Sequence, residues 1–232
     1  MSRLRAILTV VFAVACAKPS VSQRLAALEM RVAELEAAPA PAAQGPSVAE
    51  GELLFVQAQA AYDAGEYGLA KGMVAELQQR FAGTGLASRA NGLADRLRPI
   101  GITAPEVPLD AIWLQGGPVG LRTGTTLVVF WELWCPHCKR EVPAISERVA
   151  GHDVDVLLVT RLTRSSTAAA STDFLRDNGV PWPTFIDEKS FTDAFSVSGI
   201  PAAALVKDGV VVWRDHPASL DDQILDRHAP QR

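Results

Sequence analysis

Two cysteines stand two residues apart in the segment Trp-Cys-Pro-His-Cys at residues 134–138. A hydrophobic run at residues 127–131 comes directly before this segment, and a helical pattern comes directly after it. A strand would hold Cys135 at the edge of a sheet, and the N–H groups that begin the helix would stabilise its thiolate. Cys138 lies one turn further on, close enough to form a small disulfide ring. The pattern therefore predicts thiol–disulfide exchange, with Cys135 as nucleophile and Cys138 as resolving cysteine.

Two structural interpretations compete with this chemistry. A structural zinc usually needs four ligands, and the chain has one cysteine pair and four histidines, none at a ligand-like spacing downstream. We therefore predict no metal site. A structural disulfide would close a two-residue loop, which removes little entropy from the unfolded chain. Redox chemistry is favoured over both.

The residues around the pair predict the elements that must position it. Strands are expected at residues 127–131, 154–160 and 182–187, helices at 166–178 and 220–228, and a hairpin at 204–213. Asp208-Gly209 in that hairpin is a strong type I′ turn signal. Strands that alternate with helices and end in a hairpin indicate an α/β layered domain.

These features resemble the thioredoxin-like fold, in particular the TlpA/ResA-like branch of exported bacterial oxidoreductases. The resemblance covers about residues 101–232. It rests on Phe-Trp-Glu-Leu-Trp-Cys at 130–135, Cys-Lys-Arg-Glu-Val-Pro at 138–143 and Gly-Ile-Pro at 199–201, followed by the hairpin. It implies a mixed central sheet flanked by helices, preceded here by an all-α segment.

The resemblance also implies how a substrate would be held. Pro201 is expected to follow a cis peptide bond, and the backbone edge at Ile200 would pair with the substrate chain. Trp134, Pro136 and His137 would line the exposed edge around Cys135 and contact the substrate. The alternative is that Pro201 is an ordinary loop proline before a strand, but its order relative to the cysteine pair favours the functional interpretation.

Glu141 follows Cys138 by three residues and lies on the same helical face. In the ResA-like branch an acid at this place tunes the buried cysteine and relays protons, so the resemblance implies a catalytic role. Thioredoxin itself uses an acid on the preceding strand, where this chain has Val129. The alternative is that Glu141 is a solvated residue paired with a basic neighbour. Glu132 is interpreted as an exposed residue at the strand end.

The direction of electron flow stays open. Pro136-His137 resembles the DsbA-type oxidants, because a histidine there favours the thiolate and makes the disulfide more oxidising. Ile200 and Glu141 resemble the reductive members, and we favour a reductase or general interchange role. No cofactor is expected beyond the Cys135–Cys138 disulfide itself. The family implies that a membrane electron donor or an oxidant resets the pair.

The N-terminus predicts export. Arg3 and Arg5 precede a short apolar run that ends in Ala-Val-Ala-Cys at residues 13–16. This resembles a bacterial lipoprotein box, with Ala13 where leucine is usual, and predicts a signal peptide at 1–15 and lipidation of Cys16. The same residues suit the ordinary signal peptidase, so a soluble secreted form and an uncleaved anchor remain alternatives. The expected location is the periplasmic side of a bacterial cell envelope, with membrane contact through the lipid.

Residues 16–36 carry a repeating apolar stripe with spacings of 4, 3, 4 and 3. It consists of Val21, Leu25, Leu28, Val32 and Leu35. This pattern predicts a short coiled coil that could form a homo-oligomer, or a plain helical stalk. An Ala/Pro-rich linker follows at residues 37–48.

Residues 49–98 read as three helices, at 52–64, 67–81 and 86–97, separated by glycine-containing breaks. Their pattern, which consists of Ala58, Tyr62, Gly65, Tyr67 and Ala70, resembles a tetratricopeptide repeat. Such repeats follow a coiled coil in Tol-Pal-associated periplasmic proteins. The alternative is a generic helical hairpin packed on the redox domain. The formal net charge of −4 and the lack of a basic patch give no indication of nucleic-acid binding.

The sequence therefore predicts an exported, lipid-anchored oxidoreductase that reduces or exchanges disulfides in protein substrates. Two other functions stay open. The coil and repeat helices could make the protein an envelope scaffold or adaptor. The resemblance at Glu141 also suggests a dedicated apocytochrome c reductase in cytochrome c maturation.

Overall fold

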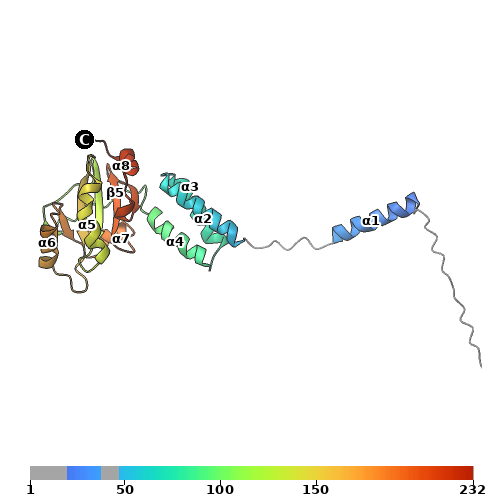
Figure 1. Cartoon of the computed structure of the whole chain (residues 1–232), viewed down its shortest axis with the longest axis horizontal. Helices are drawn as coiled ribbons and strands as arrows, with labels where there is room; N and C mark the ends of the chain where they lie inside the picture. Colours follow the sequence, from blue (N-terminus) through green and yellow to red (C-terminus); the bar gives the residue numbers. More distant parts are fainter. Residues whose placement is uncertain (1–19, 38–46, 232) are drawn as a thin grey trace, which may run out of the picture. The chain divides into compact units, whose positions relative to one another are not determined.

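The computed structural model describes residues 20–37 and 47–231 (Figure 1). Helix α1 (Val21–Ala37) belongs to a separate unit from the remainder. It confirms the helix predicted there, and the side chains of Val21, Leu25, Leu28 and Val32 are exposed. The coiled coil itself stays a prediction. The predicted signal peptide, Cys16 and most of the predicted linker lie outside the described residues.

A six-stranded mixed sheet forms the centre of the C-terminal part, in the order β1-β4-β3-β2-β5-β6. The strands are β1 (Ile112–Gln115), β2 (Thr125–Trp131), β3 (Asp155–Thr160), β4 (Thr184–Ile186), β5 (Ala202–Lys207) and β6 (Val210–Asp215). β3 runs parallel to both β2 and β4, and the other pairs are antiparallel. This arrangement confirms the mixed central sheet that the resemblance implied.

Strand β2 is buried along its whole length, which explains its unbroken hydrophobic run. Alternate residues serve two different cores, because side chains of a strand point to opposite faces. Leu127 and Val129 belong to the core that contains Cys138. Val128 and Phe130 belong to the core on the other face. The sheet therefore fixes the end of β2, where the cysteine segment begins, from both sides.

Helices cover both faces of the sheet. They are α5 (Pro136–Arg148), α6 (Ala168–Asp177), α7 (Ser190–Ala194), the 3₁₀ turn η1 (Pro217–Ser219) and α8 (Asp222–His228). The side chains of Thr167 and Asp221 cap α6 and α8. The predicted turn of the final hairpin is confirmed, since both Asp208 (φ 49°) and Gly209 (φ 83°) adopt the left-handed conformation that a type I′ turn requires.

Besides the short turn η1, two elements were not predicted. Strand β1 is a four-residue edge strand that pairs with β4 alone. Helix α7 has five residues, and the Asp187 carboxylate accepts hydrogen bonds from the backbone N–H groups of Phe191 (3.2 Å) and Thr192 (2.8 Å). Segments this short show no readable periodicity.

Three helices precede the sheet, as predicted. They are α2 (Val48–Asp63), α3 (Tyr67–Arg80) and α4 (Gly85–Leu97). Ser47 and Glu50 form a capping box at the start of α2. The helices bury their own apolar core, which includes Phe55, Leu77 and Leu93. No helix within the described ranges is long and apolar enough to cross a membrane.

The three helices also dock on the sheet domain. The Tyr62 hydroxyl donates to the backbone carbonyl of Arg214, and Arg96 forms an ion pair of 2.7 Å with Asp215. The Arg227 guanidinium donates to the carbonyl of Ala64 at 2.8 Å. These contacts fit the alternative of helices packed on the redox domain, while the tetratricopeptide interpretation stays a prediction.

Candidate active site

The end of β2 and the start of α5 place Cys135. It is the N-cap residue of α5, and its Sγ accepts a hydrogen bond from the backbone N–H of Cys138 at 3.4 Å. Pro136 occupies the first position of the helix, where its missing N–H costs nothing. The N-terminus of α5 is thus directed at the sulfur, a geometry that favours its thiolate.

The two cysteines are free thiols in this structure, and both are buried, with 4% and 0% of their surface exposed. Burial raises the pKa of the Cys138 thiol far above its usual value, and the neighbouring Cys135 and the charge of Glu132 act in the same direction. A hydrogen bond with the Glu132 backbone offsets part of this effect. Cys138 is therefore protonated at neutral pH, which suits a resolving cysteine better than an attacking one.

The loop before β5 brings a backbone edge to Cys135. The Ile200–Pro201 peptide bond is cis, as the resemblance implied. The backbone carbonyl of Ile200 lies 3.8 Å from the Cys135 sulfur and accepts a weak hydrogen bond from it. The fold thus brings together Cys135 and Ile200, which are 65 residues apart in the sequence.

Trp134 is held in place beside the cysteine. Its indole Nε1–H donates to the Glu132 carboxylate at 2.6 Å and approaches the Thr163 hydroxyl at 3.0 Å. The Arg164 guanidinium stacks on the opposite part of the same side chain, 3.7 Å from the ring centroid. Trp134 is therefore a fixed, half-buried wall of the site.

Pro136 and His137 lie at the open edge, since both side chains are exposed. The His137 Nδ1 lies 2.7 Å from the Arg140 guanidinium. These positions are compatible with the substrate contacts that the sequence predicts for them.

The two glutamates need separate accounts. Glu141 forms a 2.7 Å ion pair with Arg148, as the alternative for it supposed, but its side chain is 15% exposed and therefore not solvated as that alternative described. Its catalytic role stays a prediction. Glu132 is only 6% exposed, so the prediction of an exposed strand-end residue is wrong. Trp134 and Thr163 each donate a hydrogen bond to its carboxylate, and these donors offset the cost of burying it. Burial and the charge of Cys135 raise the pKa of the Cys138 thiol, and of the two glutamates Glu132 is the one whose charge acts in the same direction.

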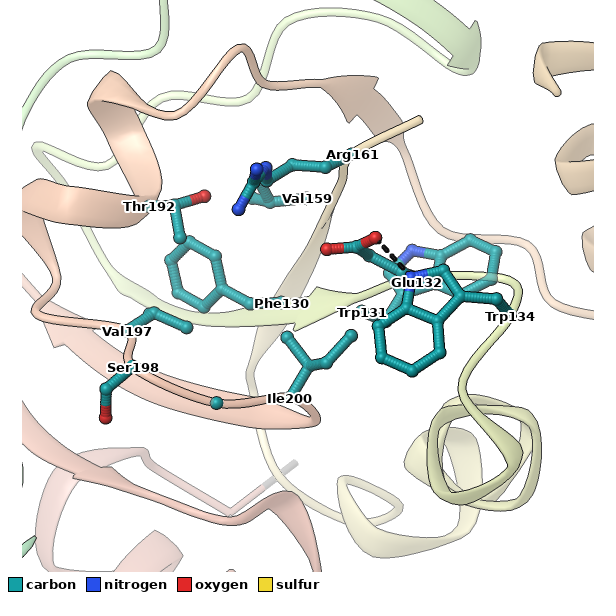
Figure 2. Close-up of a pocket in the computed structure, with 11 residues that line it drawn as sticks. Phe130, Trp131, Glu132, Trp134, Val159, Arg161, Thr192, Val197, Ser198 and Ile200 are labelled. Carbon is teal, nitrogen blue, oxygen red and sulfur yellow. Dashed lines mark hydrogen bonds between the residues drawn. The ribbon is translucent and has the colours of Figure 1, made fainter. Parts of the chain in front are cut away.

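A pocket of about 290 Å³ opens at the carboxyl ends of β2 and β3, and its lining includes Trp134 and Ile200, which both adjoin Cys135 (Figure 2). Phe130, Val159 and Ile200 supply apolar walls. Figure 2 shows the Glu132 carboxylate and the Arg161 guanidinium both directed into it. Sequence reasoning missed Arg161, although its place directly after a buried strand was a usable signal, because ligands of α/β sheets bind at that edge.

No cluster of three or more metal-binding side chains occurs in the described part of the chain. The site described above therefore consists of the cysteine pair, the Ile200 backbone edge and the adjoining pocket.

The Redoxin family matches residues 101–227 of this chain. The thiol-disulfide oxidoreductase ResA of Bacillus subtilis (strain 168) is 27% identical over 85 residues, which are 36% of this chain and 48% of ResA. The sporulation thiol-disulfide oxidoreductase A of the same strain is 25% identical over 87 residues, 36% of this chain and 53% of that protein. The chain thus spans about half the length of the curated relatives it matches.

Solved structures are also similar. The thioredoxin domain of a thiol-disulfide oxidoreductase from Bacteroides vulgatus has 19% sequence identity and a TM-score of 0.45, over 55% of this chain and 94% of that domain. The family match and the mixed sheet confirm the thioredoxin-like fold expected from the resemblance.

Proposed function

This chain belongs to the redoxin family, and from that premise we propose that it is an exported thiol–disulfide oxidoreductase acting on protein disulfides through Cys135 and Cys138. One observation carries the proposal. The Cys135 sulfur sits between the first N–H groups of α5 and the carbonyl of Ile200, directly in front of the fully buried Cys138. The names of the ResA and sporulation relatives, both thiol-disulfide oxidoreductases, support it.

In the first step the Cys135 thiolate attacks one sulfur of a substrate disulfide. The substrate S–S bond breaks, a mixed disulfide forms, and the departing substrate thiolate takes up a proton. The α5 N-terminus stabilises the attacking thiolate. The Ile200 backbone edge and the Trp134 wall hold the substrate chain, with Pro136, His137 and Pro201 completing the contact.

In the second step Cys138 loses its proton and attacks the Cys135 sulfur. The Cys135–Cys138 disulfide forms, and the second substrate thiol leaves with a proton. Two electrons and two protons have then passed to the substrate, and no dissociable cofactor takes part. A dithiol electron donor, membrane-bound in this proposal, returns them. Run in reverse, the same steps oxidise a substrate.

The acid that modulates the second step is Glu132 in this proposal. Burial and charge favour the neutral thiol of Cys138, and Glu132 contributes the nearby negative charge. Glu141 instead holds α5, because Arg148 pairs with it and also donates to the carbonyl of Pro217 at 3.0 Å. This assignment replaces the catalytic role that the resemblance implied for Glu141.

We further propose that residues 1–15 direct export and that Cys16 carries a lipid anchor. With Cys16 modified, the only remaining thiols are Cys135 and Cys138. The mass of the mature protein tests this, since cleavage and acylation each change it by a defined amount. A dedicated role in cytochrome c maturation is the second candidate, favoured by the similarity to ResA. Normal holo-cytochrome c in a strain without this protein would contradict it.

Trapping the mixed disulfide tests the proposed function. Cys138→Ser leaves Cys135 to attack but removes the resolving thiol, so disulfide-linked substrate adducts should accumulate. Cys135→Ser is the matched control, and it should form no adducts. Adducts in neither variant, or in both equally, would contradict the proposal.

A further inference from the structure

The Arg161 guanidinium is a cation without a partner at the mouth of the site. It follows β3 directly, is half-buried, and points into the pocket beside Ile200 (Figure 2). Across residues 20–37 and 47–231 the structure shows neither an ion pair nor a hydrogen bond for it. A guanidinium carries five N–H donors suited to a carboxylate, so this side chain is equipped to bind an anion.

The other charge in the pocket does not satisfy Arg161. The Glu132 carboxylate is buried and accepts hydrogen bonds from Trp134 and Thr163. Its oxygens are thus hydrogen-bonded by neutral donors, and the structure shows no salt bridge between it and Arg161 within the described residues. Of the two charged groups in the pocket, Arg161 is the one without a hydrogen-bond or ion-pair partner among the described residues.

More cations lie on the chain segments next to the cysteine motif. Arg164 stacks on Trp134, which lines the pocket, while Lys139 and Arg140 lie in the first turns of α5, the helix that Cys135 caps. None of these, nor Arg161, has a carboxylate partner in the part of the chain that the structure describes. We call Lys139, Arg140, Arg161 and Arg164 the basic rim.

Many basic residues elsewhere are paired with carboxylates, whereas Arg214 and Arg227 donate to backbone carbonyls. Those in ion pairs are Arg80, Arg89, Arg96, Arg98, Arg122, Arg148, Arg176 and Lys189. The chain as a whole has more acidic than basic residues, 26 against 22. A cluster of unpaired cations on an acidic protein, at its reactive opening, is therefore a local feature and not a consequence of composition.

We propose that this pocket binds the side chain of an acidic residue next to the target cysteine of the substrate, with Arg161 as the residue that pairs with its carboxylate. The proposal rests on the proposed exchange activity and names the class of substrate it acts on. The apolar walls of Phe130, Val159 and Ile200 would cover the methylene part of that side chain. The basic rim would attract acidic polypeptide segments from solution.

Matched peptides test the proposal. The substrates would be symmetric disulfide dimers of one short peptide. In each dimer a single position, among the two before and the two after the cysteine, would carry Glu, Gln or Lys. The full chain, reduced beforehand, would be mixed with each dimer, and the second-order rate of reduction would be measured by acid quenching and thiol alkylation. At one position or more, the Glu peptide should react about five- to tenfold faster than the Gln peptide, the size of a partly exposed charge-assisted hydrogen bond.

Variants assign that preference to Arg161. Arg161→Gln should reduce the ratio of the Glu peptide rate to the Gln peptide rate at least about threefold, and Arg161→Lys should retain part of that preference. A general effect on the cysteine thiolate would slow all peptides alike and leave the ratio intact. Arg122→Gln is the matched control, since it removes the same charge from an exposed ion pair with Glu106. High salt should weaken the preference.

The outcomes separate this inference from the proposed function. Equal reduction of Glu and Gln peptides, or a preference that survives Arg161→Gln, would overturn the inference and leave the exchange activity standing. If the chain reduces none of the peptides, Lys variants included, the exchange activity fails as well.

Discussion

Two charged regions of this protein use the same residue types in opposite ways. Where the three helices meet the sheet domain, Arg96 is paired with Asp215, and Arg227 donates to the carbonyl of Ala64. At the opening of the cysteine site, Arg161 and Arg164 have no carboxylate partner among the residues described. The first region pairs its charges internally, and the second is the one for which we propose an acidic substrate side chain as partner.

The difference shows how the role of a charged residue can be inferred from whether it has a partner. A paired and partly buried charge contributes to stability and positions one element against another. An unpaired cation beside a reactive group contributes to recognition, because its electrostatic field is available to a partner. Changes in the helix interface should therefore alter stability and not exchange, while changes around the cysteines should do the reverse.

The largest stability effect is expected for Tyr62→Phe. This change removes the hydroxyl that donates to the carbonyl of Arg214 and leaves a buried acceptor unsatisfied. We expect the free energy of unfolding to fall by about 1–3 kcal/mol, measured by urea denaturation. Tyr67→Phe is the control, because the Tyr67 hydroxyl has no hydrogen bond to any residue that the structure describes. A slower exchange rate in Tyr62→Phe would contradict the expectation that the helix interface affects stability and not exchange.

Glu132→Gln should change exchange chemistry. Removing its charge should lower the pKa of the Cys138 thiol, so the pH at which Cys138 becomes reactive should fall and the resolving step at pH 8 should accelerate by roughly two- to tenfold. The readout is the pH profile of the decay of a preformed mixed disulfide. Glu141→Gln should leave this profile in place. A shift produced by Glu141→Gln alone would return the catalytic role to that residue.

A smaller effect concerns alkaline stability. Burial raises the pKa of the Cys138 thiol, whose usual value is 9.0. Above about pH 9 the unfolded chain releases this proton while the folded chain retains it, so the reduced protein should lose stability as pH rises. Cys138→Ala should remove this part of the decline, compared by melting temperature from pH 7 to 10. Equal slopes in both proteins would show that Cys138 is not the group responsible.

The smallest effect is expected for Arg122→Gln. Arg122 and Glu106 form a 3.0 Å ion pair, and both side chains are at least half exposed. We expect a change within about 0.5 kcal/mol in unfolding free energy and no change in exchange rate. A larger loss in either measurement would show that exposed pairs contribute more here than the comparison assumes.

The sequence predicted the fold where the pattern was local and long enough. The run that became β2, the helices on both sides of Gly65 and the turn at Asp208 each follow from nearby residues. Strand β1 and helix α7 could not be predicted, since each is short, and β1 also depends on pairing with β4, far along the chain.

The site shows the same division. Cys135, Cys138 and Pro201 follow from motifs that are contiguous in the sequence. The burial of Glu132 could not be read from its neighbours, because one of its two donors, Thr163, comes from a loop 31 residues away. The place of Arg161 directly after a buried strand was a usable signal, but only the folded structure reveals that it has no ion-pair partner among the described residues.

The most direct test of the central claim is the redox equilibrium of Cys135 and Cys138 in the full chain. The protein would be equilibrated with glutathione or dithiothreitol buffers of graded potential, and the state of the two thiols read by alkylation and mass. We predict a single reversible two-electron transition with a midpoint between about −270 and −120 mV, whose position would also set the direction of electron flow. A pair that stays reduced, or that oxidises without returning, would contradict the assignment of thiol–disulfide exchange to this site.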